Sequence, residues 1–105
     1  MSGERVEVIK RRARIFLELG EELLRRGILD IASFNIHQAC QLMIKAVLLR
    51  LRGEIPRIHS LRELLGMLSA TLDWLGHSDL AEDVRRFARG AQGCSNRSRV
   101  DVYRV

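Results

Sequence analysis

The stretch IASFNIHQACQLMIKAVLLRLR, residues Ile31–Arg52, decides the fold of this chain. Placed on a helix at about 100° per residue, its apolar side chains cover well over half of the circumference. They are Ile31, Ala32, Ile36, Ala39, Cys40, Leu42, Met43, Ile44, Ala46, Val47, Leu49 and Leu51, and the polar stripe consists of Gln38, Gln41, Lys45 and Arg52. A helix packed against one partner needs an apolar arc of only about 100°. The surplus predicts a central buried helix that is covered by a second layer or by a second subunit.

The composition is typical of a single helical domain. The chain has 105 residues and a mass of 12.0 kDa, with 47% hydrophobic residues, 30% charged residues and one proline. This balance excludes a disordered chain. Arg50 interrupts the apolar run that starts at Val47, so we expect no membrane span. The N-terminus is charged from Glu4 onward and lacks the apolar segment of a signal peptide, so we expect a cytoplasmic protein.

The charge is positive, and arginine carries it. The net charge is +5, and Lys10 and Lys45 are the only lysines among 18 Lys and Arg residues. The guanidinium group suits phosphate and carboxylate ligands, so one interpretation is an anionic partner. The other interpretation is biased codon usage or a heat-adapted surface.

Neither the cysteines nor the histidines have a spacing typical of metal ligands. Cys40 and Cys94 form no C-x-x-C or Cys/His pattern, and Cys40 lies on the apolar arc, where it is expected as a small buried hydrophobe. No two of His37, His59 and His77 share an i, i+4 face with a carboxylate. We therefore expect no metal and no cofactor.

The sequence predicts three further helices, one before the central helix and two after it. Apolar residues recur with helical spacing from Glu4 to Arg26, and Gly27 ends this helix. Asp30 is placed to cap the central helix, which Gly53 and Pro56 end.

The second half of the chain contains two more helices. Ser60-x-x-Glu63 matches a capping box and predicts a helix that starts at Leu61 and ends near Trp74, before Gly76. A shorter, basic helix follows Asp79, and helical periodicity is lost from Gly90 onward. The links between the helices are short and force neighbouring helices to run antiparallel. The predicted fold class is therefore all-α, an antiparallel up-and-down four-helix bundle in residues 1–92 with a loose basic tail in residues 93–105.

The tail contains the residues that we single out as a site. Signatures of nucleotide-binding loops, zinc proteases and catalytic triads are absent, so no catalytic residue is assigned. Arg97, Arg99, Tyr103 and Arg104 combine guanidinium groups with a phenol, which can bind phosphate and stack on a base. A basic disordered end is the alternative. If these residues bind no ligand, Arg85, Arg86 and Arg89 of the fourth helix are the next candidates.

The run from Ala32 to Leu65 resembles the minimal prokaryotic HEPN domain proteins. It contains Gln38-Ala39, Lys45-Ala46, Gly53, Pro56 and His59-Ser60-Leu61 in the order and spacing of that family. The resemblance implies an up-and-down helical bundle that commonly forms homodimers, is often encoded beside a minimal nucleotidyltransferase, and binds a nucleotide or RNA. The toxin branch of the family, found in toxin–antitoxin pairs, is a metal-independent RNase with an Arg-x4-6-His motif at the dimer cleft.

The chain departs from that motif. Arg97-Ser98 begins it correctly, but Tyr103 stands near its far end and no histidine follows His77. A tyrosine with a reference pKa of about 10 is a poor general acid or base near neutral pH. The tail also resembles, loosely, the Arg-Tyr-containing end of the archaeal branch, and the fifth helix that is usual in the family is missing. We therefore predict a nucleotide- or RNA-binding module, with a toxin-type RNase and a non-catalytic scaffold as alternatives.

Overall fold

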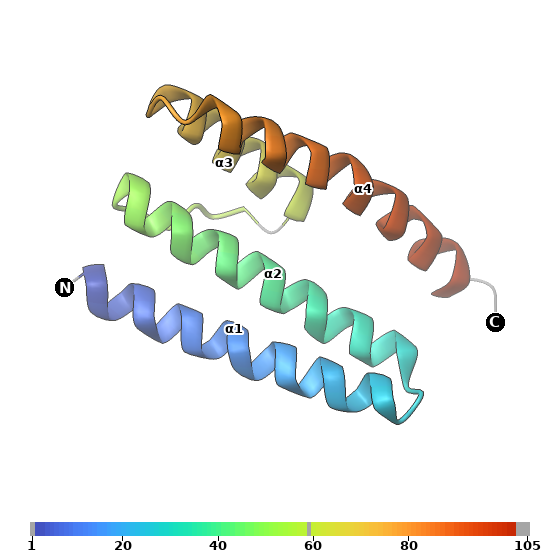
Figure 1. The fold of residues 1–105 in the computed structure, drawn as a ribbon. Helices are drawn as coiled ribbons and strands as arrows, with labels where there is room; N and C mark the ends of the chain where they lie inside the picture. Colours follow the sequence, from blue (N-terminus) through green and yellow to red (C-terminus); the bar gives the residue numbers. More distant parts are fainter. Residues whose placement is uncertain (1, 59, 103–105) are drawn as a thin grey trace. The chain divides into compact units, whose positions relative to one another are not determined.

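The chain folds into four α-helices. The computed structural model describes residues 2–58 and 60–102, and within them the side chains of residues 3–58 and 60–90. The helices are α1 (Ser2–Arg25), α2 (Leu29–Arg52), α3 (Leu61–Trp74) and α4 (Ser78–Val102) (Figure 1). No strand occurs in these ranges, and the predicted all-α class is confirmed. None of the described helices is long and apolar enough to cross a membrane. The chain forms two compact units, residues 1–64 and 65–105.

In the first unit, α1 and α2 lie side by side and antiparallel (Figure 1). Gly27 turns the chain between them with a φ of 76°, and its N–H donates to the carbonyl of Leu24 over 3.0 Å. Ile28 then occupies the N-cap of α2 without a side-chain hydrogen bond. The expectation that Asp30 caps α2 is wrong, because the tight turn starts the helix at Leu29 and leaves Asp30 in its first turn. In that turn the Asp30 carboxylate still interacts favourably with the positive, N-terminal end of the helix dipole.

The core of this unit lies where α1, α2 and the following loop meet. Val6, Ala46 and Leu49 are buried together, and Ile9 and Ile55 pack against them. Burial of this kind is the main favourable term in folding. Farther along the pair, Gly20 lets the two helices approach closely at Ile36.

The buried face of α2 differs in part from the predicted arc. Leu48, which the arc omitted, is fully buried, and Gln41 of the expected polar stripe is only 7% exposed. Ile31 is 51% exposed, and Met43, Val47 and Leu51 are exposed as well. The reason is that apolar residues cover most of the circumference, so periodicity alone does not determine which part faces the core.

The ends of α2 and α3 follow the sequence signals. Gly53 adopts a left-handed conformation with a φ of 81°, and its N–H donates to the carbonyl of Leu49. The backbone N–H of Glu63 donates to the Ser60 hydroxyl over 3.3 Å, as the capping box predicts. The predicted start of α3 at Leu61 is therefore confirmed.

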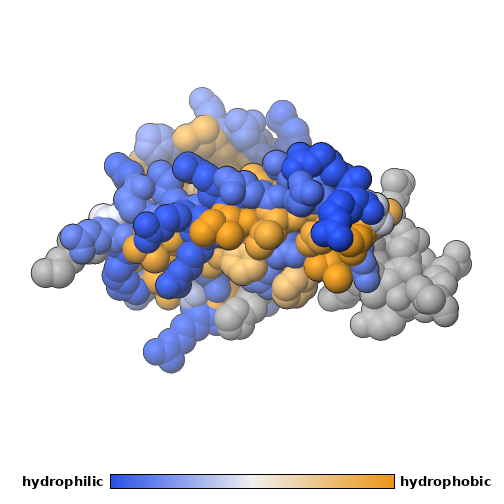
Figure 2. Space-filling view, turned by 90° about the horizontal axis from the view of Figure 1, so that it is seen from below, coloured by the Kyte–Doolittle hydropathy of each residue, from blue (hydrophilic) through white to orange (hydrophobic). Residues whose placement is uncertain are grey.

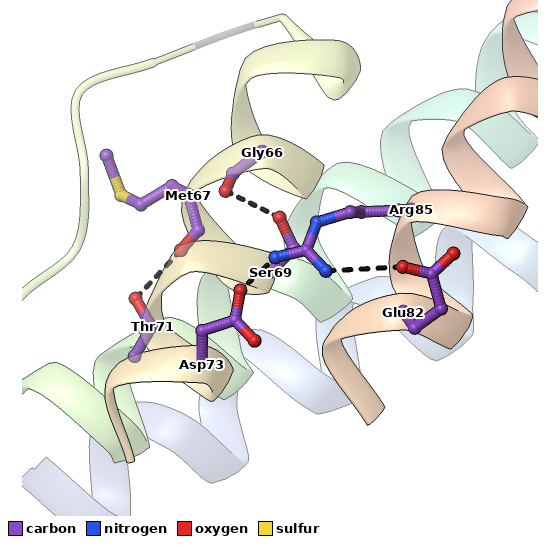
Figure 3. Close-up of polar contacts among 7 residues, drawn as sticks. All are labelled: Gly66, Met67, Ser69, Thr71, Asp73, Glu82 and Arg85. Atoms are coloured by element: carbon purple, nitrogen blue, oxygen red, sulfur yellow. Dashed lines mark hydrogen bonds and ion pairs between the residues drawn. The ribbon is translucent and has the colours of Figure 1, made fainter. Parts of the chain in front are cut away.

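In the second unit, residues 65–74 of α3 run antiparallel to α4 (Figure 1). Gly76 makes the turn between them with a φ of 87°. Buried hydroxyls inside α3 bond to its own backbone: Ser69 donates to the carbonyl of Gly66, and Thr71 to that of Met67 (Figure 3). Arg85 of α4 forms an ion pair with Asp73 of α3 (Figure 3). This pair links the two helices next to their turn.

The fourth helix is longer than expected. α4 has 25 residues and continues to Val102, so the expectation of a short helix that ends at Gly90 is wrong. A glycine in a helix costs only about 1 kcal/mol relative to alanine. Extending an existing helix adds one backbone hydrogen bond per residue without a new nucleation cost. Gly90 and Gly93 therefore do not end it. The division between a bundle and a tail after residue 92 stays a prediction.

Candidate anion-binding site

The site predicted in the tail lies beyond the side chains that the structure describes. Arg97 and Arg99 belong to the last part of α4, where only the backbone helix is described. Tyr103 and Arg104 lie outside the described residues. Their role as a nucleotide- or RNA-binding site stays a prediction.

The first unit contains a hollow with a strongly basic lining. Its volume is about 570 Å³, and we call it the basic hollow. Its lining residues are Arg5, Lys45, Gly53, Glu54, Ile55, Pro56 and Arg57. The cations Arg5, Lys45 and Arg57 contribute three positive charges and the carboxylate of Glu54 one negative charge, so the net charge of these residues is +2. It brings together residues from α1, from α2 and from the loop that follows α2.

The hydrophobic core holds these cations in place. Arg5 directly precedes Val6, and Lys45 directly precedes Ala46, so two of the cations are chain neighbours of buried core residues. The loop is anchored in the same way, because Ile55 packs against that core two residues before Arg57. The residues that fix the packing of α1, α2 and the loop therefore also fix the positions of the three charges.

Two residues shape the loop itself. The left-handed conformation of Gly53 ends α2 and redirects the chain at once, which a residue with a Cβ adopts only with strain. Pro56 cannot continue a helix and has a fixed φ. Both residues line the hollow, where Gly53 allows the sharp turn and Pro56 restricts the backbone.

The cations of the hollow are not paired with any described residue, unlike Lys10 and Arg25 of α1. Lys10 forms an ion pair with Glu7 at 3.7 Å, and Arg25 forms one with Glu22 at 2.6 Å. The hydrogen bond from Arg25 lowers the pKa of the Glu22 carboxyl. Within the described part of the chain, Arg5, Lys45 and Arg57 take part in no ion pair. Their charge is available to a ligand.

The alternative basic face on α4 is partly neutralised. Arg85 is paired with Asp73, and it also contacts Glu82 at 3.4 Å (Figure 3). The hydrogen bond to Asp73 raises the pKa of the Arg85 guanidinium. Arg89 lies 3.5 Å from the other oxygen of Glu82. Among these residues the basic hollow is therefore the better candidate for binding an anion.

Sequence reasoning missed Arg5 and Arg57 as site residues. They lie far apart in the chain, and each resembles an ordinary surface arginine. Lys45, Gly53 and Pro56 were singled out as a polar-stripe residue, as helix-end signals and as marks of a family resemblance, but not as site residues. One signal in the sequence could have indicated the site: Arg5 directly precedes Val6 in α1, and Lys45 directly precedes Ala46 in α2.

A family model for the HEPN domain matches residues 6–105. This chain belongs to the HEPN domain family. No curated protein and no solved structure gives a significant match. The family resemblance predicted from residues Ala32 to Leu65 is thereby confirmed. HEPN domains are helical bundles that are related in general to nucleotides and RNA, and they often form dimers.

Proposed function

We propose that this HEPN domain is a non-catalytic module that binds a nucleotide or RNA, with the basic hollow in contact with phosphate groups. One observation carries the proposal: Arg5, Lys45 and Arg57 converge on one hollow and form no ion pair with the described residues. Arginine presents a planar fork of donors that matches phosphate oxygens, and lysine adds a compact positive charge.

The decisive experiment is the binding of fluorescently labelled single-stranded RNA, followed by anisotropy. The variant R5Q/K45Q/R57Q should bind at least tenfold more weakly than the parent at low salt. A matched control, R11Q/R14Q/R26Q, removes the same charge from other exposed positions of the first unit. It should bind much more tightly than the hollow variant. Equal affinities of the two triple variants would contradict a specific role of the hollow.

We also propose that the domain is a homodimer and, as the family resemblance implies, the accessory partner of a minimal nucleotidyltransferase. Large apolar side chains of α1 and α2 are exposed, among them Ile15 at 50%, Ile31 at 51% and Phe34 at 60%. Apolar surface interrupts the hydrophilic surface on the face drawn in Figure 2. A two-fold pairing would cover the same patch on both copies. Light scattering should give about 24 kDa, and a mass of 12 kDa at micromolar concentration would contradict the dimer.

The main alternative is a toxin-type RNase. It requires Arg97 and a group that replaces the missing histidine, and Tyr103 is unsuited by its pKa range. We expect no cleavage of single-stranded or structured RNA. Cleavage that Arg97→Ala abolishes would instead favour the enzyme. Absence of both binding and cleavage would favour an interaction scaffold.

A further inference from the structure

We infer that the basic hollow recognises two or more neighbouring phosphoryl groups and does not recognise the nucleobase. This inference rests on the proposed function and specifies its ligand. The phosphoryl groups can come from the polyphosphate of a free nucleotide or from adjacent phosphodiesters of RNA. Both sources present closely spaced anionic oxygens to the same three cations.

The described lining contains no aromatic platform for a base. Besides its charged residues the described lining offers Gly53, Ile55 and Pro56, and none of these described residues has an aromatic side chain. Proteins that bind single-stranded nucleic acids hold bases chiefly by stacking them on aromatic rings. Among the described lining residues there are also no neutral side-chain amides or hydroxyls, which read the hydrogen-bonding edge of a base. The described lining is therefore better suited to contact phosphates than to distinguish one base from another.

The charge of the lining matches more than one phosphoryl group. Each RNA phosphodiester carries one negative charge, and the lining has a net charge of +2. The cations also come from three separate segments, α1, α2 and the loop, so they can surround a group of anions. An affinity that rises with the number of phosphates follows from this arrangement.

The helix dipoles do not reverse this conclusion. The C-terminal end of α2 near Gly53 is the negative end of its dipole, which disfavours an anion. Arg50 and Arg52 in the last turn of α2 offset that effect. Arg5 lies near the N-terminus of α1, the positive end of that helix. The side-chain charges therefore dominate the field in the hollow.

Substitution of Glu54 distinguishes an anionic from a cationic ligand, because the two ligands predict opposite changes of affinity. Glu54 is an exposed residue and the one carboxylate among the described residues of the lining. With a phosphate in the hollow, Glu54 repels the ligand, so Glu54→Gln should tighten binding several-fold. With a cationic ligand, the same substitution should weaken binding. Arg57→Gln should weaken binding of the phosphate ligand in a parallel experiment.

The experiment measures two sets of ligands by calorimetry and by competition with labelled RNA. The first set is a nucleoside and its mono-, di- and triphosphates, with adenine or guanine, together with inorganic diphosphate. The second set consists of RNA homopolymers of equal length and an abasic strand with the same backbone. The parent, Glu54→Gln, Arg57→Gln and the control R11Q/R14Q/R26Q are compared.

We expect affinity to rise with the number of phosphates, and a change of base to alter it by less than about threefold. Binding of the backbone strands without binding of free nucleotides identifies RNA as the source of the phosphates. Tight binding of diphosphate and triphosphate identifies a nucleotide. A preference of tenfold or more for one base, or weaker binding by Glu54→Gln, overturns the inference while RNA binding itself still supports the proposed function. Absence of binding in both ligand sets overturns both.

Discussion

Gly20 of α1 lies against Ile36 of α2 with no room for a side chain. A Cβ built on Gly20 would lie 2.7 Å from Cγ1 of Ile36 and 3.2 Å from the carbonyl oxygen of Ala32. Gly20→Ala should therefore destabilise the domain, because overpacking costs about 1–3 kcal/mol or more and the gain in helix propensity returns only about 1 kcal/mol. Urea unfolding followed by circular dichroism measures the change.

Gly66 of α3 provides the control for that substitution. A Cβ at Gly66 would meet nothing within 4 Å, and its φ is not positive. Gly66→Ala should stabilise the protein by up to about 1 kcal/mol, through helix propensity alone. Equal stability of the two alanine variants would show that α1 and α2 do not approach as closely as described.

The ion pair between Arg85 and Asp73 should couple α3 to α4. Both side chains are about 40% exposed, so solvent weakens the pair and its effect on stability should be small. Asp73→Asn and Arg85→Gln should each lower the thermal midpoint, and the double variant should lose less than the sum of the single losses. The coupling should shrink in 1 M salt. Additive losses at low salt would argue against the pair.

Cys40 should be a slow nucleophile. Burial raises the pKa of its thiol, so less thiolate is present at a given pH than in a free cysteine. In a Cys94→Ser background, iodoacetamide should modify Cys40 more slowly than a cysteine peptide at pH 8. The midpoint of its pH–rate profile should also be higher. A rate equal to that of the peptide would mean that Cys40 is open to solvent.

The raised pKa of the Cys40 thiol also makes the stability of the protein depend on pH. The folded thiol has a higher pKa than the unfolded thiol. The stability that this difference contributes is therefore complete below the unfolded pKa and is lost as the pH rises through the folded pKa. Cys40→Ala should remove this alkaline component from the pH dependence of unfolding.

The predicted tail site can be separated from the hollow by the salt dependence of RNA binding. If Arg97, Arg99 and Arg104 contact phosphates, their replacement by alanine should flatten the log–log slope by about 0.7 per lost contact with a single strand. If Tyr103 stacks on a base, Tyr103→Ala should cost about 1–3 kcal/mol of binding free energy with little change of slope. A tail variant that binds RNA as tightly as the parent would leave the hollow as the principal site.

Local signals in the sequence predicted the helix ends well. The capping box of Ser60 and Glu63 and the left-handed Gly53 act within a few residues, so the sequence contains all that they need. Asp30 failed as a cap because a tight turn at Gly27 left no room for a cap residue after Ile28. The continuation of α4 past Gly90 was missed because glycine weakens a helix without ending it.

The buried face and the site depended on tertiary packing. Gln41 is buried and Ile31 is exposed, although the residue types alone predict the reverse. Arg5 and Arg57 line the same hollow because Val6 and Ile55 pack into one core, and nothing in the local sequence of either arginine indicates this. Family resemblance predicted the class of function, but it did not place the basic hollow.

The most direct test of RNA binding at the basic hollow is a titration with single-stranded RNA, followed by ¹H–¹⁵N correlation spectra. The backbone amides of Gly53, Glu54 and Arg57 should shift progressively, as should the amide of Lys45, and these shifts should disappear in R5Q/K45Q/R57Q. Amides in the turn between α1 and α2 should change little. RNA binding that shifts other amides and leaves those around the hollow unchanged would contradict the account.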